Sequence, residues 1–126
     1  MVVVDTSAWI EWLIGSATAR RIEPYLPPPT DWVVPTIVQL ELAKWLTREV
    51  GEERADQVIA FTQICHVVML DTPIALAAAE AERAHKLATA DAIVFATAQN
   101  QGASLLTCDG HFKGLPAVTL IDKGKN

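Results

Sequence analysis

Four of the 15 acidic residues lie in apolar stretches of the sequence rather than in polar ones. Asp5 follows three valines, and Asp109 follows Leu-Leu-Thr-Cys, so each is expected at the carboxyl end of a buried strand. Glu41 shares the face of an expected helix with apolar side chains, and Asp91 opens a helix that is apolar nearly all round. These surroundings make the four carboxylates candidates for chemistry rather than for solubility.

Carboxylates that gather in one pocket require a compensating positive charge. Burying a single carboxylate is costly, and several close together repel one another unless they are protonated or share a cation. Basic residues are scarce near the four acids in the sequence. Hard divalent cations such as Mg²⁺ prefer oxygen ligands, so the four acids predict a metal site. The corresponding chemistry is phosphodiester hydrolysis, because such an ion polarises a phosphoryl oxygen and lowers the pKa of a bound water.

Each acid also has a plainer interpretation. Asp5 and Asp109 could form turns or caps at the ends of strands. Asp91 could favour the positive end of a helix dipole, and Glu41 could reach solvent from the edge of its apolar stripe. These interpretations weaken when all four acids are considered together, since several buried carboxylates repel one another unless they are protonated or share a cation.

Hydroxyl side chains accompany two of the acids. Thr6 and Ser7 follow Asp5, and Thr107 stands two residues before Asp109. Such hydroxyls can orient a carboxylate, a water molecule or a phosphate oxygen. Ordinary helix capping is the competing interpretation, and it is the favoured one for Thr6.

Short apolar runs alternate with segments of helical periodicity along the chain. Strands are expected at 2–4, 32–34, 66–70, 104–107 and 117–121, and helices at 8–14, 17–26, 36–50, 52–65, 73–87 and 89–101. Thr6 or Ser7 is expected to cap the first helix, and Thr72 to cap the fifth, which Pro73 would begin. The pattern predicts an α/β fold with a parallel sheet of four to five strands flanked by helices on both faces. Sites in such sheets form at the carboxyl ends of the strands.

Composition limits the classes of protein to which the chain can belong. Its 126 residues, 51% of them hydrophobic, predict one domain over 1–126. A net charge of −5 argues against binding nucleic acid by bulk positive charge alone. No apolar run approaches the ~20 residues of a membrane span, and no charged segment precedes the first apolar stretch as in a secretory signal. Cys65 and Cys108 are expected as reduced thiols of a cytoplasmic protein.

Three blocks of the sequence resemble one family. The blocks VVVDTSAWIEWL, VVPTIVQLELAKWL and ATADAIVFATAQNQGASLLTCDGHFKGLPAVTLI resemble PIN-domain ribonucleases, specifically the VapC-like toxins of prokaryotic toxin–antitoxin systems. No single motif is specific, but the ordered set is, and the blocks together span nearly the whole chain. The resemblance implies the PIN fold, a small parallel sheet flanked by helices.

The resemblance also implies a catalytic site. The positions that match the functional residues of the family are the acids Asp5, Glu41, Asp91 and Asp109 and the hydroxyls Ser7 and Thr107. A Mg²⁺ or Mn²⁺ ion bound directly by Asp5, Asp91 and Asp109 is implied. Glu41 would bind through water, hold a second ion or help activate the attacking water. The implied activity is that of an endoribonuclease, with tRNA and rRNA as the plausible substrates.

The partners are likewise implied by the family. A VapB-like antitoxin would mask the site, lay a helix along an apolar groove and place a basic side chain among the carboxylates. DNA would be reached only through that antitoxin, and the chain would form a homodimer. Trp9, Trp12 and Trp45 are candidates for the groove, with core packing as the alternative for at least one of them.

Weaker signals come from basic side chains and histidines. His111 follows Asp109-Gly110 and could lie at the rim of the pocket, whereas His66 borders an apolar strand and is expected to be structural. Contacts to an RNA backbone, with a solvated surface as the competing interpretation, could come from Arg20 and Arg21, Lys44 and Arg48, Arg83 and Lys86, and Lys113.

Two other functions compete with the nuclease. A phosphoacceptor signalling domain needs adjacent acids after the first strand, where Thr6 and Ser7 follow Asp5. It also needs an acid after the third strand, which Asp71 would supply, and a lysine where Thr107 stands. A non-catalytic module that acts with a DNA-binding partner is the other alternative. Metal binding separates it from the nuclease, because a pure binding module has no use for four converging acids.

Overall fold

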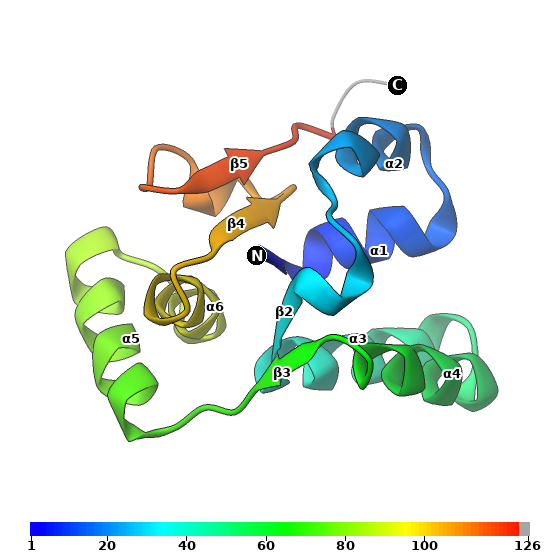
Figure 1. Cartoon of the computed structure of the whole chain (residues 1–126), viewed down its shortest axis with the longest axis horizontal. Coiled ribbons are helices and arrows are strands. Elements are labelled where there is room, and N and C mark those ends of the chain that lie inside the picture. Colours follow the sequence, from blue (N-terminus) through cyan, green and yellow to red (C-terminus); the bar gives the residue numbers. More distant parts are fainter. Residues whose placement is uncertain (124–126) are drawn as a thin grey trace.

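Five short parallel strands form the central layer of the protein, which a computed structural model describes over residues 1–123 (Figure 1). The strands are β1 (Val2–Val4), β2 (Trp32–Pro35), β3 (His66–Val68), β4 (Ser104–Thr107) and β5 (Val118–Leu120). Their order in the sheet is β3-β2-β1-β4-β5, and every neighbouring pair is parallel. The prediction of a parallel sheet of four to five strands is confirmed.

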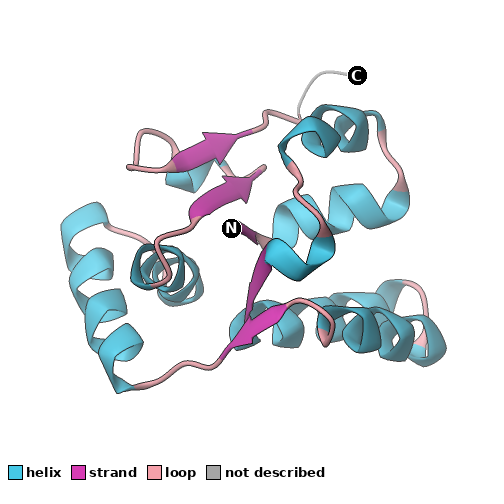
Figure 2. Ribbon diagram, in the orientation of Figure 1, coloured by secondary structure: helices cyan, strands magenta, loops and turns pink. Residues whose placement is uncertain are grey.

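Helices cover both faces of this sheet, as predicted (Figure 2). They are α1 (Thr6–Ile14), α2 (Ala17–Ile22), α3 (Thr36–Glu49), α4 (Glu52–Thr62), α5 (Thr72–His85) and α6 (Thr89–Asn100), with 3₁₀ turns η1 (Glu23–Tyr25), η2 (Pro29–Asp31) and η3 (Gly110–Phe112). The chain steps outward from β1 to β3 and then returns past β1 to β4. Since crossovers between parallel strands are right-handed, the helices before and after the return lie on opposite faces. Figure 1 shows α1 and α2 across the sheet from α5 and α6.

An aromatic cluster fixes α1 against the sheet. The Trp9 side chain is completely buried, and its ring meets those of Trp32, Trp12 and Phe61 edge-on at centroid distances of 5.0, 5.8 and 6.0 Å. Edge-to-face contacts of this kind stabilise beyond the burial of apolar area alone. Because Trp9 lies one helical turn after Asp5, the cluster also fixes the direction in which the chain leaves β1.

The start of α1 differs from the prediction. Asp5 takes the N-cap position, and Thr6 and Ser7 already belong to the helix, so the expected cap at Thr6 or Ser7 is wrong. The Asp5 side chain makes no capping hydrogen bond. Its carboxylate instead accepts hydrogen bonds from Ser7 of α1 and from Thr107 of the neighbouring strand β4, and sequence spacing does not reveal the second of these.

Asp71, not Thr72, caps α5. Its Oδ1 accepts a hydrogen bond from the backbone N–H of Ile74 at 3.0 Å, and Thr72 and Pro73 form the first helical positions. Asp is a stronger N-cap residue than Thr, and the proline at the second helical position loses no hydrogen bond there.

Several helices and strands are shorter than the sequence predicts. Strand β3 ends at Val68, which pairs with Pro35, because β2 ends there, so Met69 and Leu70 are exposed rather than paired. The helix predicted over 17–26 ends at Ile22, since Pro24 has no amide hydrogen to continue it. Two other predicted helices, 52–65 and 73–87, are also too long, since α4 ends at Thr62 and α5 at His85. The strand predicted over 117–121 covers only Val118–Leu120.

Cys65 and Cys108 are free and buried, as the prediction of reduced thiols requires. Burial raises the pKa of both thiols to about 11, so the reactive thiolate form is scarce at neutral pH. Among the helices of residues 1–123, none combines the length and the apolar character that crossing a membrane requires.

Candidate active site

The order of the strands reverses between β1 and β4, and the carboxyl ends of parallel strands at such a reversal are where ligands bind in sheets of this kind. Val4 pairs with Leu106 across the two strands, and the backbone N–H of Asp5 continues the ladder to the carbonyl of Leu106 at 2.9 Å. Asp5 and Asp109 therefore leave adjacent strands at the same edge of the sheet. The expectation that both carboxylates reach one edge is confirmed.

The two predicted hydroxyls hold the Asp5 carboxylate. Ser7 Oγ and Thr107 Oγ1 both donate to Asp5 Oδ2, at 2.9 and 2.8 Å. Ser7 Oγ in turn accepts from the backbone N–H of Cys108 at 3.0 Å, and Thr107 Oγ1 from that of Asp109 at 2.9 Å. Each hydroxyl thus connects Asp5 to the backbone that follows β4. The four hydrogen bonds orient the Asp5 carboxylate and anchor the segment that carries Asp109.

Glu41 enters the site through a hydrogen bond that the sequence did not indicate. Thr6 Oγ1 donates to Glu41 Oε1 at 2.6 Å, joining α1 to α3. The interpretation that Thr6 caps the helix is therefore wrong, because its hydroxyl donates to Glu41. The only available signal was that a hydroxyl directly follows Asp5, and that signal did not identify its partner 35 residues away.

Asp91 and Asp109 meet at the imidazole of His111. His111 Nδ1 lies 3.2 Å from Asp109 Oδ1 and 3.5 Å from Asp91 Oδ2. Asp91 is the third residue of α6 rather than its first, so its carboxylate lies at the positive end of the helix dipole. One ligand atom from each of the three residues lies within 4.8 Å of the others.

The turn η3 positions His111 over the acids. Asp109 caps this turn, its Oδ1 accepting from the backbone N–H of His111 at 2.9 Å, and the next residue, Phe112, is completely buried. The backbone of His111 is therefore fixed, while 76% of its side chain remains exposed. The structure places His111 beside both acids, which is closer than the sequence indicated, while a position at the rim of a pocket stays a prediction.

Burial and mutual repulsion perturb the carboxylates. Burial raises the pKa of Asp5 to about 6, although the hydrogen bonds from Thr107 and Ser7 oppose this rise. The pKa of Asp91 is raised chiefly by burial and further by the charges of Asp109 and Glu41, while His111 opposes the rise. Since the charge of Asp91 also raises the pKa of Asp5, Asp91 interacts electrostatically with each of the other three acids.

These residues fit a divalent cation. The acids supply hard oxygen ligands and several mutually repelling negative charges, which a doubly charged ion would offset. Asp91, Asp109 and His111 present ligand atoms within 4.8 Å of one another. Direct binding of the ion by Asp5 stays a prediction. Asp5 lies deeper than the other acids, and its Oδ2 already accepts hydrogen bonds from two hydroxyl groups.

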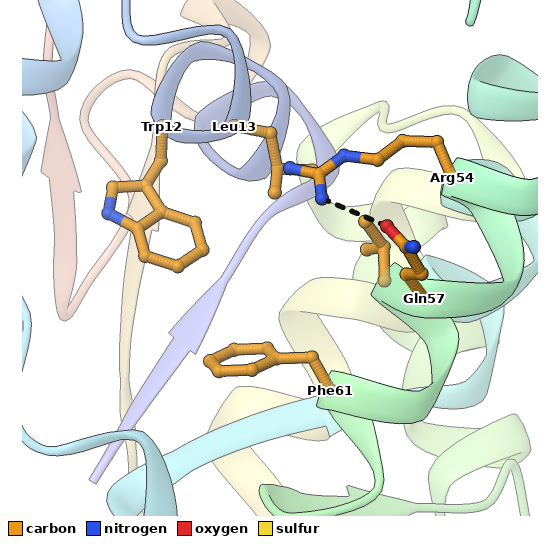
Figure 3. A pocket seen from close by; sticks show the side chains of 6 residues that line it. Trp12, Leu13, Arg54, Gln57 and Phe61 are labelled. Atoms are coloured by element: carbon orange, nitrogen blue, oxygen red, sulfur yellow. Dashed lines mark hydrogen bonds between the residues drawn. The ribbon is translucent and has the colours of Figure 1, made fainter.

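A separate pocket of about 260 Å³ lies between α1 and α4 (Figure 3). We call it the α1–α4 pocket, and its lining consists of Trp12, Leu13, Arg54, Gln57, Val58 and Phe61. Figure 3 shows the rings of Trp12 and Phe61 on one side and the hydrogen-bonded Arg54 and Gln57 on the other. Of the tryptophans predicted for a groove, Trp12 lines this pocket, whereas Trp9 is core and Trp45 packs partly buried against the core.

The basic residues predicted to contact RNA are exposed, and some already have acidic partners. Arg48 pairs with Glu49 and Arg83 with Glu80, in exposed ion pairs that contribute little to stability. Lys44 is exposed on α3 and lies three residues from Glu41, so the two share a helical face. A contact between RNA and any of these side chains stays a prediction.

The sequence model of the PIN domain family matches residues 2–118, and the chain belongs to this family. No curated protein sequence matches the chain. A chain of a toxin–antitoxin complex from Klebsiella pneumoniae has the same fold, with a TM-score of 0.81 at 23% identity over 94% of this chain and 96% of that one.

Two further structures share the fold. VapC20 from Mycobacterium tuberculosis, described as a toxin that cleaves the sarcin–ricin loop, has a TM-score of 0.72 at 24% identity over 92% of this chain and 95% of its own. DNA-bound VapBC from Salmonella typhimurium has a TM-score of 0.72 at 20% identity over 94% and 95%. The likeness confirms the PIN fold that the sequence blocks predicted.

Proposed function

We propose that this protein is a metal-dependent endoribonuclease and the toxin of a toxin–antitoxin module, formed by one domain over 1–126 and acting in the cytoplasm. The observation that carries the proposal is the electrostatic interaction of Asp91 with Asp5, Glu41 and Asp109 near the point where the strand order reverses. Membership of the PIN family and the shared fold with toxin structures support it.

Each side chain has a defined task in this proposal. Asp91 and Asp109 would hold the cation, with the more deeply buried Asp5 behind them. A bound Mg²⁺ or Mn²⁺ would polarise the scissile phosphoryl group and lower the pKa of a coordinated water. Ser7 and Thr107 keep the Asp5 carboxylate in one orientation. Thr6 holds Glu41 Oε1, so this carboxylate is oriented to accept a proton from an attacking water or to bind the ion through water.

The test is cleavage of total cellular RNA by the purified chain, free of any antitoxin, with Mg²⁺ or Mn²⁺ and then with EDTA. Discrete cuts that disappear with EDTA would support the proposal, and sequencing their ends would distinguish tRNA from rRNA as substrate. A folded protein that makes no metal-dependent cut with either ion would contradict it.

The alternative functions explain fewer of the observations. Asp71, the acid that a phosphoacceptor domain would need, serves as the N-cap of α5. A non-catalytic binding module would account for the α1–α4 pocket but not for neighbouring acids whose charges raise the pKa of Asp91 and of Asp5.

An antitoxin is the proposed occupant of the α1–α4 pocket, since the aromatic and aliphatic lining suits the apolar face of a helix. DNA would be bound through that antitoxin, in keeping with the net charge of −5 of this chain. The structures of VapBC from Salmonella typhimurium and from Rickettsia felis, both solved with DNA, are consistent with this arrangement.

Leu13→Arg is expected to weaken binding of the antitoxin at least about tenfold, because it places a charge in an apolar contact. The probe is a purified VapB-like antitoxin, and calorimetry measures its affinity. Ile14→Arg is the matched control, because Ile14 is the next residue of α1, is exposed and does not line the pocket. Equal affinities for the two variants would exclude this pocket as the binding surface.

A homodimer is the remaining proposed assembly. Met69 and Leu76 are 73% and 68% exposed, Leu70 is also exposed, and a second pocket of about 260 Å³ lies between α5 and α6. Exposed apolar surface of this kind is typical of a contact with another protein. Light scattering of the isolated chain measures whether it is dimeric.

A further inference from the structure

We infer that His111 is a nitrogen ligand of the cation held by Asp91 and Asp109, and that the site therefore favours Mn²⁺ or another first-row transition ion over Mg²⁺. This inference rests on the proposed function, which needs the cation, and adds a residue and an ion preference to it. The family resemblance supplied only carboxylate ligands.

The first support is geometric. His111 Nδ1 lies 3.5 and 3.2 Å from the nearest oxygens of Asp91 and Asp109. Adjacent ligands of an octahedral ion with bonds of ~2.1 Å are about 3.0 Å apart. His111 Nδ1 is therefore spaced from each oxygen nearly as a neighbouring ligand of one ion, and all three atoms lie within 4.8 Å of one another.

The second support is that the protein fixes His111 at this position. The backbone of His111 donates to Asp109, and the buried Phe112 anchors the same turn. The other two histidines lie elsewhere: His85 packs against the ring of Phe95, and His66 faces Gln101. Only His111 among the three is positioned to supply a nitrogen ligand.

The chemistry of the donor atoms determines the ion preference. Carboxylate oxygen and water suit both Mg²⁺ and Mn²⁺, whereas imidazole nitrogen suits first-row transition ions, a series whose affinity for such sites rises from Mn²⁺ towards Cu²⁺ and in which Mg²⁺, with no d electrons, has no place. Two carboxylates with one imidazole form a mixed set of ligands. Replacing one oxygen ligand by nitrogen should strengthen Mn²⁺ binding more than Mg²⁺ binding.

A different role for His111 predicts the opposite result. A protonated imidazole at the same distances would be an internal counter-ion that compensates the acids and must leave when a metal enters. Removing a competitor would strengthen metal binding, whereas removing a ligand would weaken it. The sign of the change in affinity therefore separates the two roles.

The experiment combines pulsed electron paramagnetic resonance of the Mn²⁺-loaded chain with calorimetric titration of Mn²⁺ and of Mg²⁺, both at a fixed neutral pH. We expect ¹⁴N coupling to Mn²⁺ in the unmodified protein and its loss in His111→Ala. The same variant should bind Mn²⁺ ~10-fold or more weakly and Mg²⁺ within about threefold of the unmodified protein. His66→Ala is the matched control, which should retain both the coupling and the affinity.

Several results would overturn the inference. Mn²⁺ bound without ¹⁴N coupling would do so, and so would unchanged or tighter Mn²⁺ binding by His111→Ala. Metal-dependent cleavage of RNA by the unmodified protein in the same preparations would show that the proposed function survives such a result. A protein that binds neither ion would contradict the inference and the proposed function together.

Discussion

Asp91→Asn is expected to reduce RNA cleavage by about 10³-fold or more while the fold stays intact. The substitution keeps the size of the side chain but removes the charge at the point where α6, Asp109 and His111 meet. Since burial and repulsion already raise the pKa of Asp91, losing that charge should not destabilise the metal-free fold. Cleavage time courses with Mg²⁺ and with Mn²⁺, together with growth of cells that express the variant, measure the effect.

Asp71→Asn is the matched control for this substitution. Asp71 caps α5, and Asn caps helices about as well as Asp, so the fold and the cleavage rate should both be retained. A cleavage rate in Asp91→Asn equal to that of the unmodified protein would remove Asp91 from the catalytic site.

Asp5→Asn is expected to stabilise the metal-free protein at pH 7 by up to about 3 kcal/mol, in addition to impairing cleavage. Asp5 is only 5% exposed, and its pKa rises from 3.8 unfolded to about 6 folded. Each unit of this shift corresponds to about 1.4 kcal/mol, which sets the upper limit. The Asn Oδ1 can still accept the hydrogen bonds from Ser7 and Thr107, so the variant loses the buried charge but keeps its contacts.

The sign of the pH dependence follows from the same shift. Between pH 3.8 and about 6 the folded protein binds more protons at Asp5 than the unfolded chain does, so its free energy of unfolding falls as the pH rises. The stability that the folded protein gains from protonating Asp5 is fully present below pH 3.8 and is lost above about pH 6. The two proteins should therefore differ little near pH 4 and most near pH 7.

Urea denaturation in EDTA across this pH range measures the effect. Asp56→Asn serves as the control, because Asp56 is exposed on α4 and its replacement should leave the pH profile unchanged. The Asp91 carboxyl, whose pKa is also raised, should leave a weaker slope of the same sign in Asp5→Asn. Parallel pH profiles for Asp5→Asn and the unmodified protein would contradict the assignment of a buried, destabilising charge to Asp5.

The sequence by itself determined the strands and the acids at their ends. Three consecutive valines before Asp5 and the apolar run before Asp109 predicted buried strands that end in carboxylates, because burial on both faces imposes a continuous apolar pattern. In a parallel sheet the carboxyl ends of strands share one edge. The approach of these acids therefore followed from local pattern and general topology.

Only the tertiary structure decided the partners of the polar side chains. Thr6 binds Glu41 from 35 residues away, and Thr107 binds Asp5 from 102 residues away, so no local spacing encodes either contact. The position of His111 likewise depends on how η3 docks beside α6. Apolar periodicity records whether a residue is buried, but a hydrogen bond or a shared ligand site depends on distances that exist only after distant segments have packed together.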